Sequence, residues 1–98
     1  DFTFVSNVVN GNILAATTPG IAGIAVNCAC HGQITLNYLV NKINDILGKD
    51  IKPEYAAPKP GDIKHSFAAV AAAEKYLGYK PSVLFDEGLL KTINWYKN

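Results

Sequence analysis

The chain of 98 residues lacks the features typical of membrane-spanning, secreted and nucleic-acid-binding proteins. No run approaches the roughly 20 apolar residues that a membrane-spanning helix needs, and the first residues lack the charged and apolar order of a signal peptide. Nine basic and eight acidic residues leave a net charge of +1, with no basic cluster. We therefore expect no membrane span and no nucleic-acid partner, and we interpret the chain as soluble and cytoplasmic.

The chain also has no methionine and only two cysteines, Cys28 and Cys30. In extended backbone these two point the same way, about 6–7 Å apart, which does not suit a disulfide. With His31 they could be three zinc ligands, but zinc sites add a further ligand pair, and His65 is the only other histidine. Cys30 and His31 are also the pair to test as nucleophile and base, although no orienting acid can be assigned to them. We favour two small packed side chains, and we predict neither a metal nor a catalytic residue.

Apolar spacing and capping residues predict four helices. They run from the cap Ser6 to Pro19-Gly20, from the cap Thr35 to Gly48, from Ala68 to Gly78, and from near Asp86 to Tyr96. The second has the strongest pattern, because its apolar residues recur at three- and four-residue steps: Leu36, Leu39, Val40, Ile43, Ile46 and Leu47. We expect this face to be buried against a strand at Ile24–Val26.

Three short strands are predicted, one before the first helix, at Asp1–Val5, which could also be an extended entry, and two between the helices. Phe2–Phe4 alternates apolar and polar residues, Ile21–Cys30 is a nearly uninterrupted apolar run, and Ile51–Tyr55 alternates with a proline that confines it to an edge or an end. The expected fold class is therefore α/β: a small mixed domain of about four helices and two to four short strands. Residues 1–98 are expected to form a single domain.

The most distinctive stretch is Lys59-Pro60-Gly61-Asp62-Ile63-Lys64-His65-Ser66. Prolines restrict the backbone on both sides of Lys59, and Gly61 can adopt conformations closed to other residues, so a shaped loop is predicted. Such a loop can hold Lys59 and Asp62 on one side, where a cation beside a carboxylate suits a phosphate next to a sugar. The alternative is an ordinary solvated turn, because Pro, Gly and Asp are common turn formers.

Taken together, separated motifs across nearly the whole chain resemble a known family. The motifs are Asp1–Val9, Val26–Cys30, Ile34–Asn37, Lys59–Ser66, Leu77–Pro81, Glu87–Leu89 and Trp95–Tyr96. In order and spacing they resemble the C-terminal third of extended short-chain dehydrogenases/reductases, the NAD-dependent nucleotide-sugar epimerases and dehydratases. The likeness is closest to UDP-sugar 4-epimerases, including those that act on N-acetylated hexosamines in surface-polysaccharide synthesis.

The resemblance implies roles for three residues. The family's Arg-x-Gly-Asp segment places its Arg on the diphosphate and its Asp on the nucleoside, so Lys59 and Asp62 inherit these roles. Lys59 keeps the charge of that Arg but loses its bidentate fork. Gln33 stands where many members carry another Arg near the nucleotide, and His31 stands where a Gly is usual.

The resemblance implies that the family's Gly-rich dinucleotide loop and its catalytic Tyr-x-x-x-Lys pair would both lie before Asp1, outside the motifs matched here. No cofactor is therefore expected in this chain, although the resemblance implies NAD for a full-length relative that epimerises C4. The chain is interpreted as the UDP-sugar-binding portion of such a protein, not catalytic alone, with weak affinity for UDP or UDP-sugar.

Two alternatives remain: a free-standing non-catalytic module that binds nucleotide-sugar weakly or binds protein, and an unrelated small structural domain. Strands that would border the family's larger sheet would have bare edges here, so a homo-oligomer is also expected.

Overall fold

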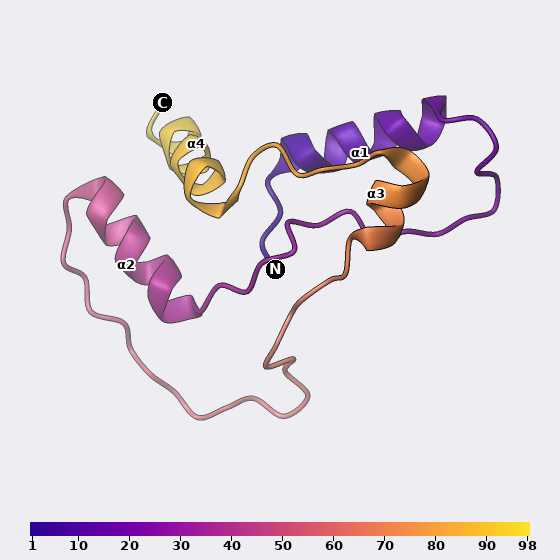
Figure 1. The fold of residues 1–98 in the computed structure, drawn as a ribbon. Coiled ribbons are helices and arrows are strands. Elements are labelled where there is room, and N and C mark those ends of the chain that lie inside the picture. Colours follow the sequence, from indigo (N-terminus) through magenta and orange to yellow (C-terminus); the bar gives the residue numbers. More distant parts are fainter.

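The computed structural model describes residues 1–98 as four helices joined by extended segments and turns (Figure 1). The helices are α1 (Val5–Thr17), α2 (Leu36–Leu47), α3 (Ala71–Leu77) and α4 (Phe85–Lys97). No β-strand is formed. The predicted α/β fold with two to four short strands is therefore wrong, and the chain is all-helical.

Two of the three predicted strands, Ile21–Cys30 and Ile51–Tyr55, fail for a common physical reason. A strand requires a second strand beside it to take up its N–H and C=O groups, and here side chains take up several of them instead. The Cys30 N–H donates to the Asp1 carboxylate at 3.1 Å, and the Ala29 carbonyl accepts from the Tyr79 hydroxyl at 2.9 Å. The N–H and C=O of Ile51 both bond to the side-chain amide of Asn44. Alternation and apolar runs in the sequence predict extended backbone, but they do not show whether a neighbouring strand lies beside it.

Helix α2 has the boundaries that its sequence predicts. The Thr35 hydroxyl accepts the Tyr38 N–H at 3.1 Å, and Gly48 ends the helix with a left-handed φ of 62°. The expected packing is wrong, however. Helix α2 packs against α4 rather than against Ile24–Val26, and none of its residues is fully buried. An ion pair between Lys42 and Asp86, 3.0 Å long, joins these two helices.

The other three helices exist near their predicted places, with shifted starts. Helix α1 begins one residue before Ser6, so the predicted cap lies inside the first turn, and Phe4 is the residue before the helix. Helix α3 starts three residues later than Ala68 and ends at the left-handed Gly78, as predicted. None of the four helices is both long and apolar enough to cross a membrane.

The small core lies where α1 packs against α3. Ala73, Leu77 and Tyr79 are buried there, and partly buried side chains from α1 and from the segment after it close around them: Leu14, Ile21, Val26 and Cys28. The molecule measures 50 × 36 × 17 Å, and a helix with its side chains is already about 10–12 Å wide. Because the fold is little more than one helical layer thick, only eight of the 98 residues are buried.

One buried polar side chain fixes α1 to the segment between α3 and α4. The side-chain nitrogen of Asn7 donates to the Val83 carbonyl at 2.7 Å, and its oxygen accepts from the N–H groups of Ser82 and Val83 at 3.0 and 3.1 Å. These bonds satisfy an amide that is 1% exposed. They hold the N-terminal segment in the centre of the molecule, where it borders the site described next (Figure 1).

Candidate functional site

A hollow of about 550 Å³ lies between the segment that precedes α2 and the end of the long loop joining α2 to α3. Asp1, Gln33 and Thr35 line one wall, and Lys64, His65 and Ser66 line the other. Its volume falls in the range of small-molecule sites, and its lining mixes cationic, hydroxyl and amide groups with apolar ones. Of the three predicted site residues, Gln33 lines this hollow.

The wall that carries Gln33 is held by local hydrogen bonds. The carboxylate of Asp1 accepts from the N–H groups of Cys30 and Gly32, at 3.1 and 3.3 Å. On the other side of Gln33, Thr35 caps α2 and so sets the direction in which the helix leaves the wall. Gln33 itself is exposed, which leaves its amide free to meet a ligand.

His31 joins the two walls. It is the one residue other than glycine with a positive φ, 55°, a conformation that costs a bulky residue about 1–3 kcal/mol. Its ring lies 4.7 Å from the ring of Phe67, and its Nδ1 lies 3.3 Å from the Ala68 carbonyl oxygen. Glycine adopts a left-handed backbone without strain, which is the physical reason why a Gly would be usual at this position in the family that the sequence motifs resemble. Here the contacts of His31 with Phe67 and Ala68 hold the end of the loop beside the segment that follows His31.

The predicted shaped turn is present further along the same loop. The Lys59 carbonyl accepts the Asp62 N–H at 3.2 Å, and Gly61 has a φ of 85°, which with Pro60 before it matches a type II β-turn. Both Lys59 and Asp62 are exposed, and neither lines the hollow. Their contact with a ligand stays a prediction.

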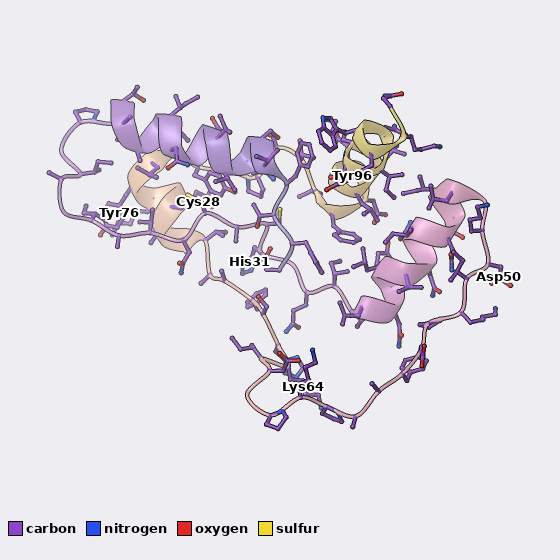
Figure 2. The ribbon with its side chains drawn as sticks, turned by 180° about the vertical axis from the view of Figure 1, so that it is seen from behind. Cys28, His31, Asp50, Lys64, Tyr76 and Tyr96 are labelled. Carbon is purple, nitrogen blue, oxygen red and sulfur yellow. The ribbon has the colours of Figure 1, made fainter.

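Lys64, His65 and Ser66 line the hollow opposite Gln33, and the sequence interpretation had assigned them no role. Figure 2 shows Lys64 on the loop. No spacing pattern marks these three residues as part of a site. They line the hollow only because His31 contacts Phe67 and Ala68, which directly follow them in the loop. The single available signal was their place inside the distinctive stretch 59–66.

The possible zinc ligands do not converge. The Cys30 sulfur lies 3.5 Å from the side-chain nitrogen of Asn7 and 3.7 Å from the Val83 carbonyl oxygen, whereas the His31 ring faces the loop. Burial raises the pKa of the Cys28 thiol, which opposes the thiolate that a metal needs. No three His, Cys, Asp or Glu side chains in the structure are grouped closely enough to hold a metal ion.

The glycines do not fit a dinucleotide either. A dinucleotide-binding turn joins a strand to the N-terminus of a helix and places glycine beside the pyrophosphate. Here no strand exists, and the left-handed glycines end helices or occupy turns: Gly20, Gly23, Gly48, Gly61 and Gly78. The residues present therefore do not form an NAD site.

No family model matches the chain, but individual proteins do. The UDP-glucuronate 4-epimerase of Thermodesulfobacterium geofontis is 29% identical over 97 residues, which are 99% of this chain and 30% of that protein. The UDP-glucose 4-epimerase of Thermotoga maritima, solved with UDP-glucose, superposes with a TM-score of 0.91 at 30% identity. That match covers 99% of this chain and 31% of the other.

A second solved structure, the enzyme WbmF of Bordetella bronchiseptica in complex with NADH, is 35% identical with a TM-score of 0.82. The match covers 99% of this chain and 29% of WbmF. The chain thus spans about 30% of the length of the curated relatives that it matches.

Proposed function

The chain is homologous over its whole length to the C-terminal part of UDP-sugar 4-epimerases, which have the short-chain dehydrogenase/reductase fold, and we propose that it is the substrate-binding portion of such an epimerase. The observation that carries this proposal is the match of 99% of the chain, at a TM-score of 0.91, to an epimerase solved with UDP-glucose. The ligand proposed here is UDP or a UDP-sugar.

The hollow and the turn beside it supply suitable chemistry for that ligand. In this proposal the ammonium of Lys59 attracts the diphosphate, and the carboxylate of Asp62 accepts hydrogen bonds from the ribose hydroxyls. Gln33 offers both a donor and an acceptor to the nucleotide from the opposite wall. Lys64 adds a second cation on the lining of the hollow. Two ammonium groups act as point charges without the fork of an arginine, so we expect a dissociation constant near 1 mM, about −4 kcal/mol.

NAD and the catalytic groups are assigned to the part of the relatives that this chain does not span. The chain contains no residues that fit a dinucleotide, and no catalytic step is derived for its own side chains. Its proposed task is to bind and orient the nucleotide of the substrate. We place this task in the cytoplasm, where free thiols such as Cys28 and Cys30 stay reduced.

A second candidate is a free-standing module that has lost catalysis and retains weak nucleotide-sugar or protein binding. The residues that favour it are Lys59 and Gln33, which stand where the family carries arginines and so give up bidentate contacts to the diphosphate. If the free-standing module still recognises a nucleotide, it would bind UDP at the same hollow and turn as the substrate-binding portion of an epimerase.

The test is an amide-shift titration of the 98-residue chain with UDP. Shifts should concentrate at Lys59–His65 and around Gln33, weaken with added salt, and largely vanish in Lys59→Ala. The matched control is Lys52→Ala in the same loop, since Lys52 is exposed and pairs with Asp50 instead. The control should keep the wild-type shifts.

Two further ligands separate the proposed roles. Inorganic diphosphate should shift the amides near Lys59 and Lys64, while uridine should act mainly near Asp62 and lose its effect in Asp62→Asn. No shifts at millimolar UDP, or equal losses in Lys59→Ala and Lys52→Ala, would remove the ligand role and leave the stretch as a solvated turn.

A further inference from the structure

Residue 31 needs a left-handed backbone whatever its side chain is. The N–H groups of Cys30 and Gly32, on either side of it, both donate to the carboxylate of Asp1, at 3.1 and 3.3 Å. A left-handed residue in such a turn directs neighbouring N–H groups toward a single anion. The φ of 55° at His31 is therefore part of how the wall of Gln33 is built.

Histidine is an unfavourable residue for that backbone. The five other residues with a positive φ are all glycine, which adopts this conformation without strain. A side chain in a strained conformation persists when its surroundings hold it there. The contacts of the His31 side chain must therefore offset the strain in its backbone.

Those contacts are made to the end of the loop that joins α2 to α3. The imidazole ring lies 4.7 Å from the ring of Phe67, tilted by 47°. Its Nδ1 lies 3.3 Å from the Ala68 carbonyl oxygen, and because a carbonyl can only accept, Nδ1 is the donor. Both partners belong to this chain, so the contact is complete without residues outside it.

The position of one wall of the hollow depends on this contact. Phe67 and Ala68 directly follow Lys64–Ser66, which line the hollow. The main-chain nitrogen of Asp1 also donates to the Ser66 carbonyl. No other hydrogen bond or ion pair joins residues 63–66 to the rest of the chain. Figure 2 shows His31 on the segment before α2 and Lys64 on the loop.

We propose that His31 is a positioning residue of the nucleotide site, which holds the wall formed by Lys64–Ser66 in place before a ligand arrives. The identity of the ligand, UDP or a UDP-sugar, rests on the function proposed above. Lys59 and Gln33 stand where the family carries arginines, so the direct contacts to the diphosphate are weaker here. A wall that is already ordered loses less entropy when the ligand binds, and this offsets part of that weakness.

Nuclear magnetic resonance relaxation of the backbone amides tests the proposal on the 98-residue chain without ligand. In the wild type, the order parameters of Lys64–Ala68 should be about 0.85, as in rigid backbone, and in His31→Gly they should fall to about 0.6 or lower. The melting temperature of His31→Gly should stay within about 3 °C of the wild type, because the variant loses the contacts and the strain together. A role in the stability of the whole fold would instead lower the melting temperature and loosen all four helices.

Two further variants separate the ring of His31 from its backbone. Asparagine adopts a left-handed backbone readily but has no ring, so His31→Asn should loosen the loop as His31→Gly does. His31→Phe keeps a ring beside Phe67 and should retain most of the order. Phe67→Ala removes the contact from the loop side, and in the His31→Gly background it should loosen the loop no further.

The matched control is Tyr55→Ala. Tyr55 is an exposed aromatic residue of the same loop, but its hydroxyl donates to the side chain of Asn37 instead of contacting His31. The order parameters of Lys64–Ala68 should therefore remain at the wild-type values in this variant.

Titration with UDP distinguishes this inference from the function on which it rests. If the wild type binds UDP, His31→Gly should raise the dissociation constant about 10-fold, because binding must then order the loop. If the wild type does not bind UDP, the proposed function fails, and the order parameters alone decide whether His31 holds the wall. Equal order in the wild type and His31→Gly would overturn the inference, and so would equal losses in His31→Gly and Tyr55→Ala. A looser loop with unchanged affinity for UDP would also overturn the positioning role.

Discussion

Replacing Asn7 by Ala is expected to be among the most damaging single changes in this chain. Asn7 is 1% exposed, and its amide bonds to the N–H and C=O of Val83 and to the N–H of Ser82, at 2.7–3.1 Å. Alanine removes all three bonds at once. Because Val83 is itself only 7% exposed, its N–H would then lack a partner inside the protein, and its C=O would keep only the long, weak bond from the Cys30 thiol at 3.7 Å.

The magnitude follows from those two groups. An unsatisfied buried donor or acceptor costs about 1–3 kcal/mol, so the N–H and C=O of Val83 together cost about 2–5 kcal/mol, with the C=O at the lower end because the Cys30 thiol still donates to it. The Ser82 N–H is only partly buried and adds less. Ala is a better helix former than Asn by about half a kcal/mol, which offsets a small part. We expect a net loss near 3–4 kcal/mol, a large share of the roughly 5–15 kcal/mol of a small domain.

Urea denaturation followed by circular dichroism measures this loss, with Asn12→Ala as the matched control. Asn12 lies in the same helix but is exposed, and its amide bonds only to the Val8 carbonyl at 3.0 Å. The control should stay within about 0.5 kcal/mol of the wild type. All chains should be compared at one concentration, because association adds stability. A difference below about 1 kcal/mol between the two variants would refute the reasoning from buried unpaired groups.

Two further changes probe how the helices pack. The ammonium of Lys42 holds the pKa of the Asp86 carboxyl below its ordinary value. Its contribution is therefore complete above a pH of about 4 and lost as pH falls through the lower pKa of the folded state. Asp86→Asn should be less stable than the wild type at neutral pH and equal to it in strong acid, and a gap that is independent of pH in urea titrations would contradict this. Gly88→Ala would place a Cβ 2.9 Å from the Cβ of Phe4, so it should cost about 1 kcal/mol net of the gain in helix propensity. Thermal melts measure this cost. The control is Gly32→Ala, whose new Cβ would meet nothing within 4 Å and which should not destabilise the fold.

The candidate site shows how far local patterns reach. The type II turn at Lys59–Asp62 could be predicted because Pro60 and Gly61 each restrict or permit one backbone angle, and such restrictions act within four residues. The hollow could not be predicted in the same way. It depends on His31 meeting Phe67 and Ala68, residues more than thirty-five positions away in the chain, in a left-handed conformation unusual for histidine.

The sequence by itself determined the elements whose signals are local. Helix α2 is the clearest case, because Thr35, Gly48 and the apolar spacing between them act within single turns of the helix. Only the tertiary structure decided what the extended runs would do. Ile21–Cys30 would have become a strand beside a partner, but the nearest groups are side chains such as Asp1 and Tyr79, so its backbone bonds end on them. The packing partner of α2 was also decided by the tertiary structure. The apolar stripe of a helix favours burial against any apolar surface, and here α4 rather than a strand lies against it.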